Sequence, residues 1–122
     1  MPVIVKEVSD ELVGGPVLVT IEYSVVAEQE SKFVKAMHQY ARVRRRDGAY
    51  EWGIYRDIEA ANRFVEIFLV HSWAEHLRQH ERQTKADREL EQRVYKYVSG
   101  EPKVRHLLLY ADSTKRLDVA DD

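Results

Sequence analysis

The segment Arg63–Ser72 constrains the fold more than any other, because it carries apolar residues at its odd positions and also at its even positions. Side chains along a strand point alternately to its two faces, so both faces of this strand are expected to be covered. Its odd positions carry Val65, Ile67 and Leu69, and its even positions carry Phe64, Phe68 and Val70. Ser72-Trp73-Ala74-Glu75 follows directly and has the spacing of a capping box. The sequence therefore predicts a buried strand that leads into a capped helix.

Three further strands are expected, because β-branched and aromatic residues gather in short runs. These runs are Val17–Val26, Tyr50–Arg56 and Val104–Ala111. A first helix is expected over Ala27–Arg46, where apolar residues recur with helical spacing before the stop signal Asp47-Gly48.

The second helix is expected to run without interruption from Ser72 to about Val98, and to stop at Ser99-Gly100 ahead of Pro102. The order of elements is then β-α-β-β-α-β, the α+β ferredoxin-like unit. This order predicts an antiparallel four-stranded sheet with two helices on one face.

The other face of this sheet is also apolar in the third and fourth strands, and the helices cannot cover it. A second copy of the same sheet is the simplest cover, which predicts a symmetric homodimer through the sheet. The alternative is that these are ordinary surface apolar residues, which monomeric proteins also carry.

Length and composition narrow the class of protein. The 122 residues suit one domain, with 1–15 as an arm or linker, 16–111 as the folded domain and 112–122 as a polar tail. The chain has no cysteine, no apolar run of membrane-spanning length and no signal-peptide pattern, so a soluble cytoplasmic protein without membrane insertion is expected. Its net charge of -2 predicts no general attraction to nucleic acid or to anionic membranes.

The second helix carries the candidate site, because the middle of its buried stripe is polar. On one continuous helix the stripe holds Trp73, Leu77, His80, Thr84, Asp87, Glu91, Val94, Tyr95 and Val98. A buried Asp87 needs a partner, and Arg44 on the first helix could supply it. Met37 and Tyr40 share the stripe of Arg44 and could line the same cavity. The alternative is a satisfied polar cluster that only fixes helix packing.

Metal and cofactor motifs are weak in this chain. His76 and His80 have i, i+4 spacing, but Leu77 stands where a zincin has glutamate, and Glu81 and His38 do not obviously complete a site. No glycine-rich phosphate loop is present. No metal and no cofactor are therefore expected. Arg42, Arg44, Arg45 and Arg46 are expected to form a solvated cluster in the last turn of the first helix.

The order of elements and the run Ser72–His80 resemble the dimeric α+β barrel superfamily, in particular its antibiotic-biosynthesis-monooxygenase-like domains. Gly15–Tyr23, Arg42–Gly53 and Ser72–Arg82 are similar to the soluble C-terminal domain of major facilitator transporters of the enterobactin-exporter type. That resemblance covers about residues 15–111.

The resemblance implies a homodimeric module that binds a small molecule or a transporter partner. It also leaves open a cofactor-independent monooxygenase of phenol-like or anthrone-like substrates, with His80 as base and Asp87 orienting it. A haem-binding relative would use His76 or His80. The remaining ligand-binding candidates are Met37, Tyr40, Arg44, Trp73, His76 and Thr84.

Overall fold

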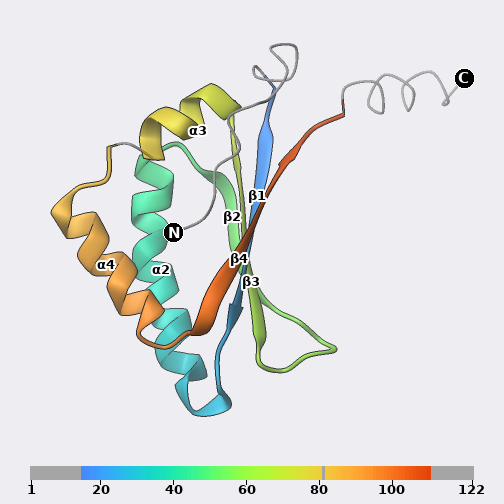
Figure 1. Ribbon diagram of the computed structural model, residues 1–122, viewed down its shortest axis with the longest axis vertical. Helices are drawn as coiled ribbons and strands as arrows, with labels where there is room; N and C mark the ends of the chain where they lie inside the picture. The colour runs from blue at the N-terminus through green and yellow to red at the C-terminus, as the bar shows by residue number, and fades with distance from the viewer. Residues whose placement is uncertain (1–14, 81, 111–122) are drawn as a thin grey trace, which may run out of the picture.

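The computed structural model describes residues 15–80 and 82–110, which form one antiparallel sheet covered by helices on one side (Figure 1). The strands lie in the order β2-β3-β1-β4. The α+β ferredoxin-like fold with β-α-β-β-α-β order is therefore confirmed. The elements are β1 Val17–Ser24, η1 Ala27–Gln29, α2 Glu30–Arg46, β2 Tyr50–Arg56, β3 Arg63–Val70, α3 Trp73–His80, α4 Lys85–Tyr95 and β4 Ser99–Leu108.

The core lies between the helices and one face of the sheet. The odd positions of β1 from Val17 to Tyr23 are buried, and so are the even positions of β3 from Phe64 to Val70. Phe33, Met37 and Tyr40 of α2 close this layer from the helix side. The alternation in each strand places every second side chain in this core.

In residues 15–80 and 82–110, no helix covers the opposite face of the sheet (Figure 1). β1 pairs with β3 and β4 so that Leu18 lies between Leu69 and Leu107, and Thr20 lies beside Ile67. Leu107 is 47% exposed and Leu109 is 53% exposed. The apolar face predicted from β3 and β4 is thus present, with Glu22, Arg63 and Arg105 forming ion pairs within it.

The fourth strand starts earlier than predicted, at Ser99 and not at Val104. Ser99-Gly100 and Pro102 look like a helix stop in the sequence, yet they belong to β4. An edge strand tolerates a proline, because the missing N–H can face away from the sheet, and β4 is an edge strand. Gly100 adopts a φ of 71°, and the pairing of β1 with β4 shifts register between Glu22 and Ser24. Ala111, the predicted strand end, lies outside the described residues.

The prediction of one continuous helix from Ser72 to Val98 was wrong. α3 ends at His80, and α4 begins at Lys85 with its own capping box at Thr84 and Asp87. The Thr84 hydroxyl accepts from the Asp87 N–H at 3.1 Å, and the Asp87 carboxylate accepts from the Thr84 N–H at 3.1 Å. Thr84-Lys85-Ala86-Asp87 is itself a helix-start signal, and it competes with continuation of the preceding helix.

The start of α3 agrees with the prediction in part. The Ser72 hydroxyl accepts from the Glu75 N–H at 3.1 Å, as a capping box requires. The Glu75 carboxylate, however, bonds Gln79 and Arg78 one turn further along the helix.

Asp87 makes the stability of the fold dependent on pH. Its carboxylate is 2% exposed and accepts from Arg46 at 2.6 and 3.0 Å. The hydrogen bond from Arg46, opposed by burial and supported by Thr84, lowers the pKa of Asp87 from 3.8 to about 2. A lowered folded-state pKa gives stability that is complete above the unfolded-state pKa and is lost as the pH falls through the folded-state value.

We therefore expect Asp87→Asn to destabilise the protein by about 1–2 kcal/mol at pH 6, because the exposed Arg46 side chain is screened by solvent. The difference from the wild type should shrink as the pH falls from 4 to 2. Urea unfolding at a series of pH values measures it. Thr84→Val is the comparison, because losing the cap should cost about 1 kcal/mol at every pH. If Asp87→Asn lost the same free energy of unfolding at every pH, the lowered pKa of Asp87 would be contradicted.

Candidate functional site

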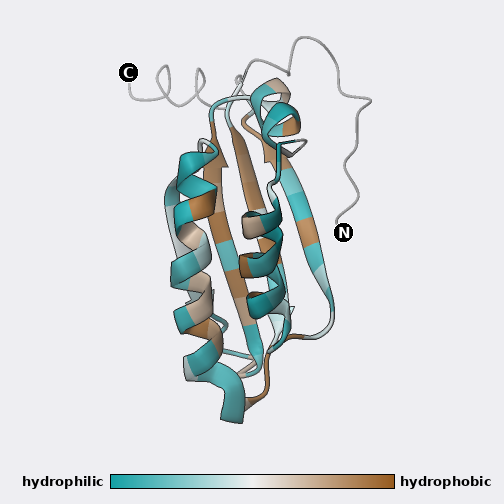
Figure 2. Cartoon of the chain, turned by 90° about the vertical axis from the view of Figure 1, so that its left-hand side faces the viewer, coloured by the Kyte–Doolittle hydropathy of each residue, from teal (hydrophilic) through white to brown (hydrophobic). Residues whose placement is uncertain are grey.

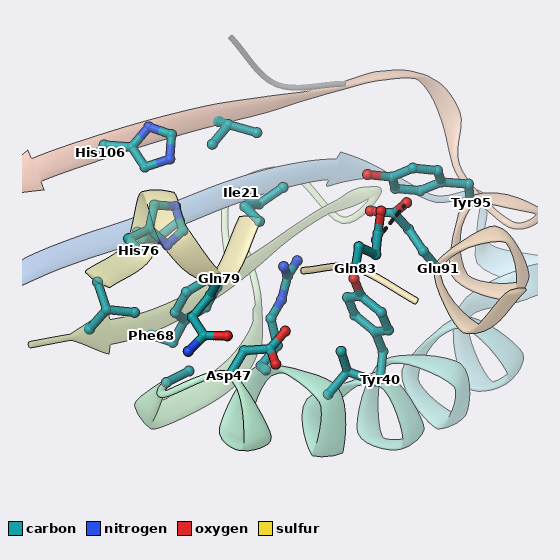
Figure 3. A pocket seen from close by; sticks show the side chains of 16 residues that line it. Ile21, Tyr40, Asp47, Phe68, His76, Gln79, Gln83, Glu91, Tyr95 and His106 are labelled. Atoms are coloured by element: carbon teal, nitrogen blue, oxygen red, sulfur yellow. Dashed lines mark hydrogen bonds between the residues drawn. The ribbon is translucent and has the colours of Figure 1, made fainter. Parts of the chain in front are cut away.

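A cavity of about 80 Å³ lies between the helix layer and the sheet (Figure 3). One water needs roughly 10–15 Å³ of such space, so the cavity has room for several waters or for part of a small ligand. Its apolar lining comes mainly from the three strands β1, β3 and β4: Val19, Ile21, Phe68, Val70 and Val104, with Val43 and Ala49 beside them. The sheet thus forms an apolar floor.

Two histidines mark one end of the cavity (Figure 3). His76 comes from α3 and His106 from β4, and their ring centroids are 5.2 Å apart. The indole of Trp73 lies behind them, with its ring centroid 5.1 Å from that of His106. Trp73 is 4% exposed, and its Nε1 has no hydrogen-bond partner among the described residues. This end therefore places two imidazole rings beside a buried aromatic wall.

The other end of the cavity carries two tyrosines and an acid–amide pair (Figure 3). Tyr40 comes from α2, and Tyr95 comes from α4. Gln83 donates to the Glu91 carboxylate at 3.5 Å. Burial raises the pKa of Tyr95 to about 12, and burial also raises the pKa of Tyr40. Both phenols therefore stay protonated at neutral pH and can donate hydrogen bonds.

Arg44 forms part of the cavity wall and is held by a buried carboxylate beneath it. Glu66 is 0% exposed and accepts from Arg44 Nε at 2.8 Å and from Nη2 at 3.0 Å. Tyr23 Oη and Trp52 Nε1 each donate to the same carboxylate at 2.8 Å. Burial lowers the pKa of Arg44, but the Glu66 charge outweighs it and keeps that pKa above its ordinary value. Arg44 is thus a permanent cation fixed by a fully bonded partner.

The guanidinium of Arg44 also lies over two aromatic rings. Its Cζ lies 4.7 Å from the ring centroid of Tyr40 and 5.0 Å from that of Phe68, which are distances for cation–π attraction. Glu66, Tyr40 and Phe68 together hold the side chain in place. Arg44 therefore presents one preset donor edge to the cavity at no further cost in side-chain entropy.

Three of the predicted site residues line the cavity, namely Tyr40, Arg44 and His76. Met37 is fully buried in the core, and Trp73 packs behind the histidines. Thr84 and Asp87 cap α4, and none of these four is among the lining residues. Asp87 pairs with Arg46 and not with Arg44 as expected. The side chain of His80 lies outside the described part of the chain.

The expectation that Arg44 belongs to a solvated cluster was also wrong. The Arg44 side chain is 20% exposed and faces inward, while Arg42, Arg45 and Arg46 are exposed. On a helix, Arg44 falls on the same side as Phe33, Met37 and Tyr40, which places it over the sheet. Its partner Glu66 is the single charge in the apolar run of β3, and that isolated charge was the signal for a buried pair.

Three residues that line the cavity were not predicted from the sequence, namely Gln79, Gln83 and His106. The alternation of Val104, His106 and Leu108 along β4 would have placed His106 on the helix-covered face, had the strand register been known. Gln79 and Gln83 lie near the break between α3 and α4, and a continuous helix would have placed them differently.

Within residues 15–80 and 82–110, no helix combines the length and apolar character needed to cross a membrane. In the same residues, no three His, Asp or Glu side chains come together as a group that could hold a metal ion.

Comparison with known proteins gives a family match and a set of solved structures with a similar fold. The family model described as "Transmembrane secretion effector" matches residues 2–115. No curated protein matches the chain.

Solved structures match the fold at low sequence identity. A candidate antibiotic biosynthesis monooxygenase from Bordetella bronchiseptica is 21% identical, with a TM-score of 0.68 over 79% of this chain and 98% of that one. One from Caulobacter crescentus is 14% identical, with a TM-score of 0.69 over 83% and 95%. SnoaB, a cofactor-independent oxygenase from Streptomyces nogalater, is 13% identical, with a TM-score of 0.61 over 75% and 91%. At these identities the likeness concerns the fold alone.

Proposed function

Because the chain belongs to the transmembrane secretion effector family, we propose that it is the ligand-binding module of a secretion system, acting in the cytoplasm beside a major facilitator exporter. The observation that carries this proposal is the cavity, where preset polar groups converge on an apolar floor. Such convergence is typical of small-molecule sites, in which apolar walls give affinity and a few polar groups fix orientation.

The lining supports a small, flat ligand that carries hydrogen-bonding groups at both ends. The apolar strand residues can contact a ring face. Arg44 and the protonated phenols of Tyr40 and Tyr95 can donate to carbonyl or phenolic oxygens. His76 and His106 can accept or donate at the opposite end. A phenol or catechol derivative combines these features.

A thermal-shift screen of the full chain against polyphenols, anthrones, catecholate siderophores and haem tests this proposal. A ligand at 100 times its Kd should add about 2.7 kcal/mol, which raises the Tm by several degrees. We expect His106→Leu, which removes a polar group from the cavity, to reduce the shift. His71→Leu is the matched control, because His71 is exposed and stacks on Tyr50 away from the cavity. No shift with any compound, or equal loss in both variants, would contradict the proposal.

We also propose that the module is a homodimer joined through the open face of the sheet. Leu18, Ile67, Leu69 and Leu107 form a continuous apolar strip across three strands of that face. Contiguous exposed apolar surface of this kind marks interaction sites in folded proteins. A two-fold axis would pack the strip on its own copy and leave both helix layers on the outside.

A second candidate function is cofactor-independent oxygenation of a phenol or anthrone. The observation that favours it is that two histidines line the cavity, in a fold shared with SnoaB. A histidine would take the substrate proton, and the resulting anion would react with O₂. His80 remains the predicted base, and the Asp87 oxygens that were to orient it already bond Arg46 and Thr84.

Oxygen uptake with an anthrone, measured with an oxygen electrode, separates the two functions. The monooxygenase function predicts uptake that falls at least a hundredfold in His80→Ala, which is the range expected for losing a general base. His76→Ala and His106→Ala test the two histidines of the cavity in the same assay. If the wild type bound the ligand without taking up oxygen, the monooxygenase function would be contradicted and only the binding function would remain.

A further inference from the structure

The outer surface of the helix layer is strongly basic. In Glu30–Arg46 and Lys85–Lys96, nine lysine and arginine side chains are exposed, whereas the exposed acidic side chains are those of Glu89 and, at 41%, Glu30. The nine are Lys32, Lys35, Arg42, Arg45, Arg46, Lys85, Arg88, Arg93 and Lys96. Arg46 pairs with Asp47 and Asp87. No ion pair joins the other eight to a carboxylate in the part of the chain that the structure describes, so their charge is not neutralised locally.

Helical spacing gathers these cations on one surface. In α2, Lys35 and Arg42 are seven residues apart and lie opposite the buried Phe33 and Tyr40. In α4, Lys85 and Lys96 lie opposite the buried Asp87 and Val94 in the same way. α2 and α4 pack beside each other over the sheet (Figure 1), and the side of this layer that faces away from the sheet is predominantly hydrophilic (Figure 2).

We propose that this basic surface docks on a membrane rich in anionic lipid headgroups. Lysine and arginine near such a surface contribute attraction that adds up over the residues within one Debye length of it, roughly 8 Å at physiological salt. Membership of a family of transmembrane secretion effectors supplies an independent reason for a membrane to be the partner. This inference does not depend on the cavity or on its ligand.

The character of the surface favours lipid over nucleic acid. Single-stranded nucleic acid is bound through aromatic platforms on which bases stack, and α2 and α4 expose no Phe, Tyr or Trp. Two helices side by side also form a broad face, whereas readers of the major groove insert a single helix. The net charge of -2 concealed this surface, because the acidic residues of the chain lie mostly elsewhere.

Sedimentation of the full chain with phosphatidylcholine vesicles containing 30 mol% phosphatidylglycerol tests the proposal. The helix-face variant is Lys35→Gln/Arg42→Gln/Lys85→Gln. Each basic residue near an anionic surface is worth about fivefold in partitioning, so this variant should bind roughly a hundredfold more weakly. The matched control Arg56→Gln/Arg78→Gln/Lys103→Gln removes three exposed charges outside α2 and α4 and should bind like the wild type.

Circular dichroism and gel filtration establish that both variants are folded and share the wild-type oligomeric state. Binding should be absent on pure phosphatidylcholine and should weaken as salt is raised. No binding of the wild type to the anionic vesicles would overturn the proposal, and so would equal losses in the two variants. Tighter binding to a random-sequence DNA duplex than to vesicles would replace the membrane by nucleic acid as the partner.

Discussion

Glu66→Leu is expected to lower the free energy of unfolding by about 3–5 kcal/mol, which is a large part of the stability of a domain this size. The substitution leaves the Arg44 guanidinium in the core without its counter-charge. It also removes the acceptor for Tyr23 Oη and Trp52 Nε1. Urea unfolding followed by tryptophan fluorescence and by circular dichroism measures the loss.

A double substitution separates the ion pair from simple packing. In Arg44→Met/Glu66→Leu both charges are gone, and the buried region becomes apolar with similar volume, so a large part of the lost stability should return. Glu30→Leu is the control on the surface, because its pair with Arg56 is exposed and is worth at most about 1 kcal/mol. If the double variant were no more stable than Glu66→Leu, the buried charge of Arg44 would not be the cause of the stability lost in Glu66→Leu.

Ile67→Lys is expected to convert the proposed homodimer into a folded monomer. Ile67 sits in the middle of the open face, between Thr20 of β1 and Gly53 of β2. A lysine in the centre of a packed apolar interface has to give up its hydration without a partner, which should weaken the dimer by at least a hundredfold. Sedimentation velocity at protein concentrations of 1–100 µM measures the change in the dimer Kd, because this range can detect a change of about two orders of magnitude.

The fold of the single chain should survive this substitution, because Ile67 is only half-buried before association. Gln92→Lys introduces the same charge on the exposed face of α4 and should leave the dimer intact. A wild type that stays monomeric even at the top of this concentration range would contradict the homodimer. An unchanged sedimentation coefficient in Ile67→Lys would contradict it as well.

Local patterns in the sequence sufficed for the architecture. The apolar alternation of β1 and β3, the turn at Asp47-Gly48 and the cap at Ser72 each reflect interactions within a few residues. Such signals can be read without knowing the tertiary structure, because backbone geometry sets their spacing. The α+β topology and the apolar open face of the sheet followed from them.

The wrong predictions, for the second helix and for the start of β4, came from places where two local signals compete. Thr84 and Asp87 could have continued a helical stripe or capped a new helix, and the reciprocal bonds of the capping box prevailed. Ser99-Gly100 and Pro102 could have ended a helix or begun an edge strand. In both cases the outcome depended on which neighbours were available to pack against, and a single sequence does not display them.

By itself, the sequence determined the order of the strands and of the first helix, the faces that they bury and the family resemblance. Only the tertiary structure decided which polar groups meet. Glu66 lies 22 positions from Arg44 in the chain, and Asp87 lies 41 positions from Arg46, so the spacing of residues along one helix could not pair them. The pairing of β4 with β1 brings His106 opposite Val19, and the packing of α3 against the sheet brings His76 to it. Helix periodicity and strand alternation act over a few residues, whereas charge pairing and cavity formation depend on distances across the folded core.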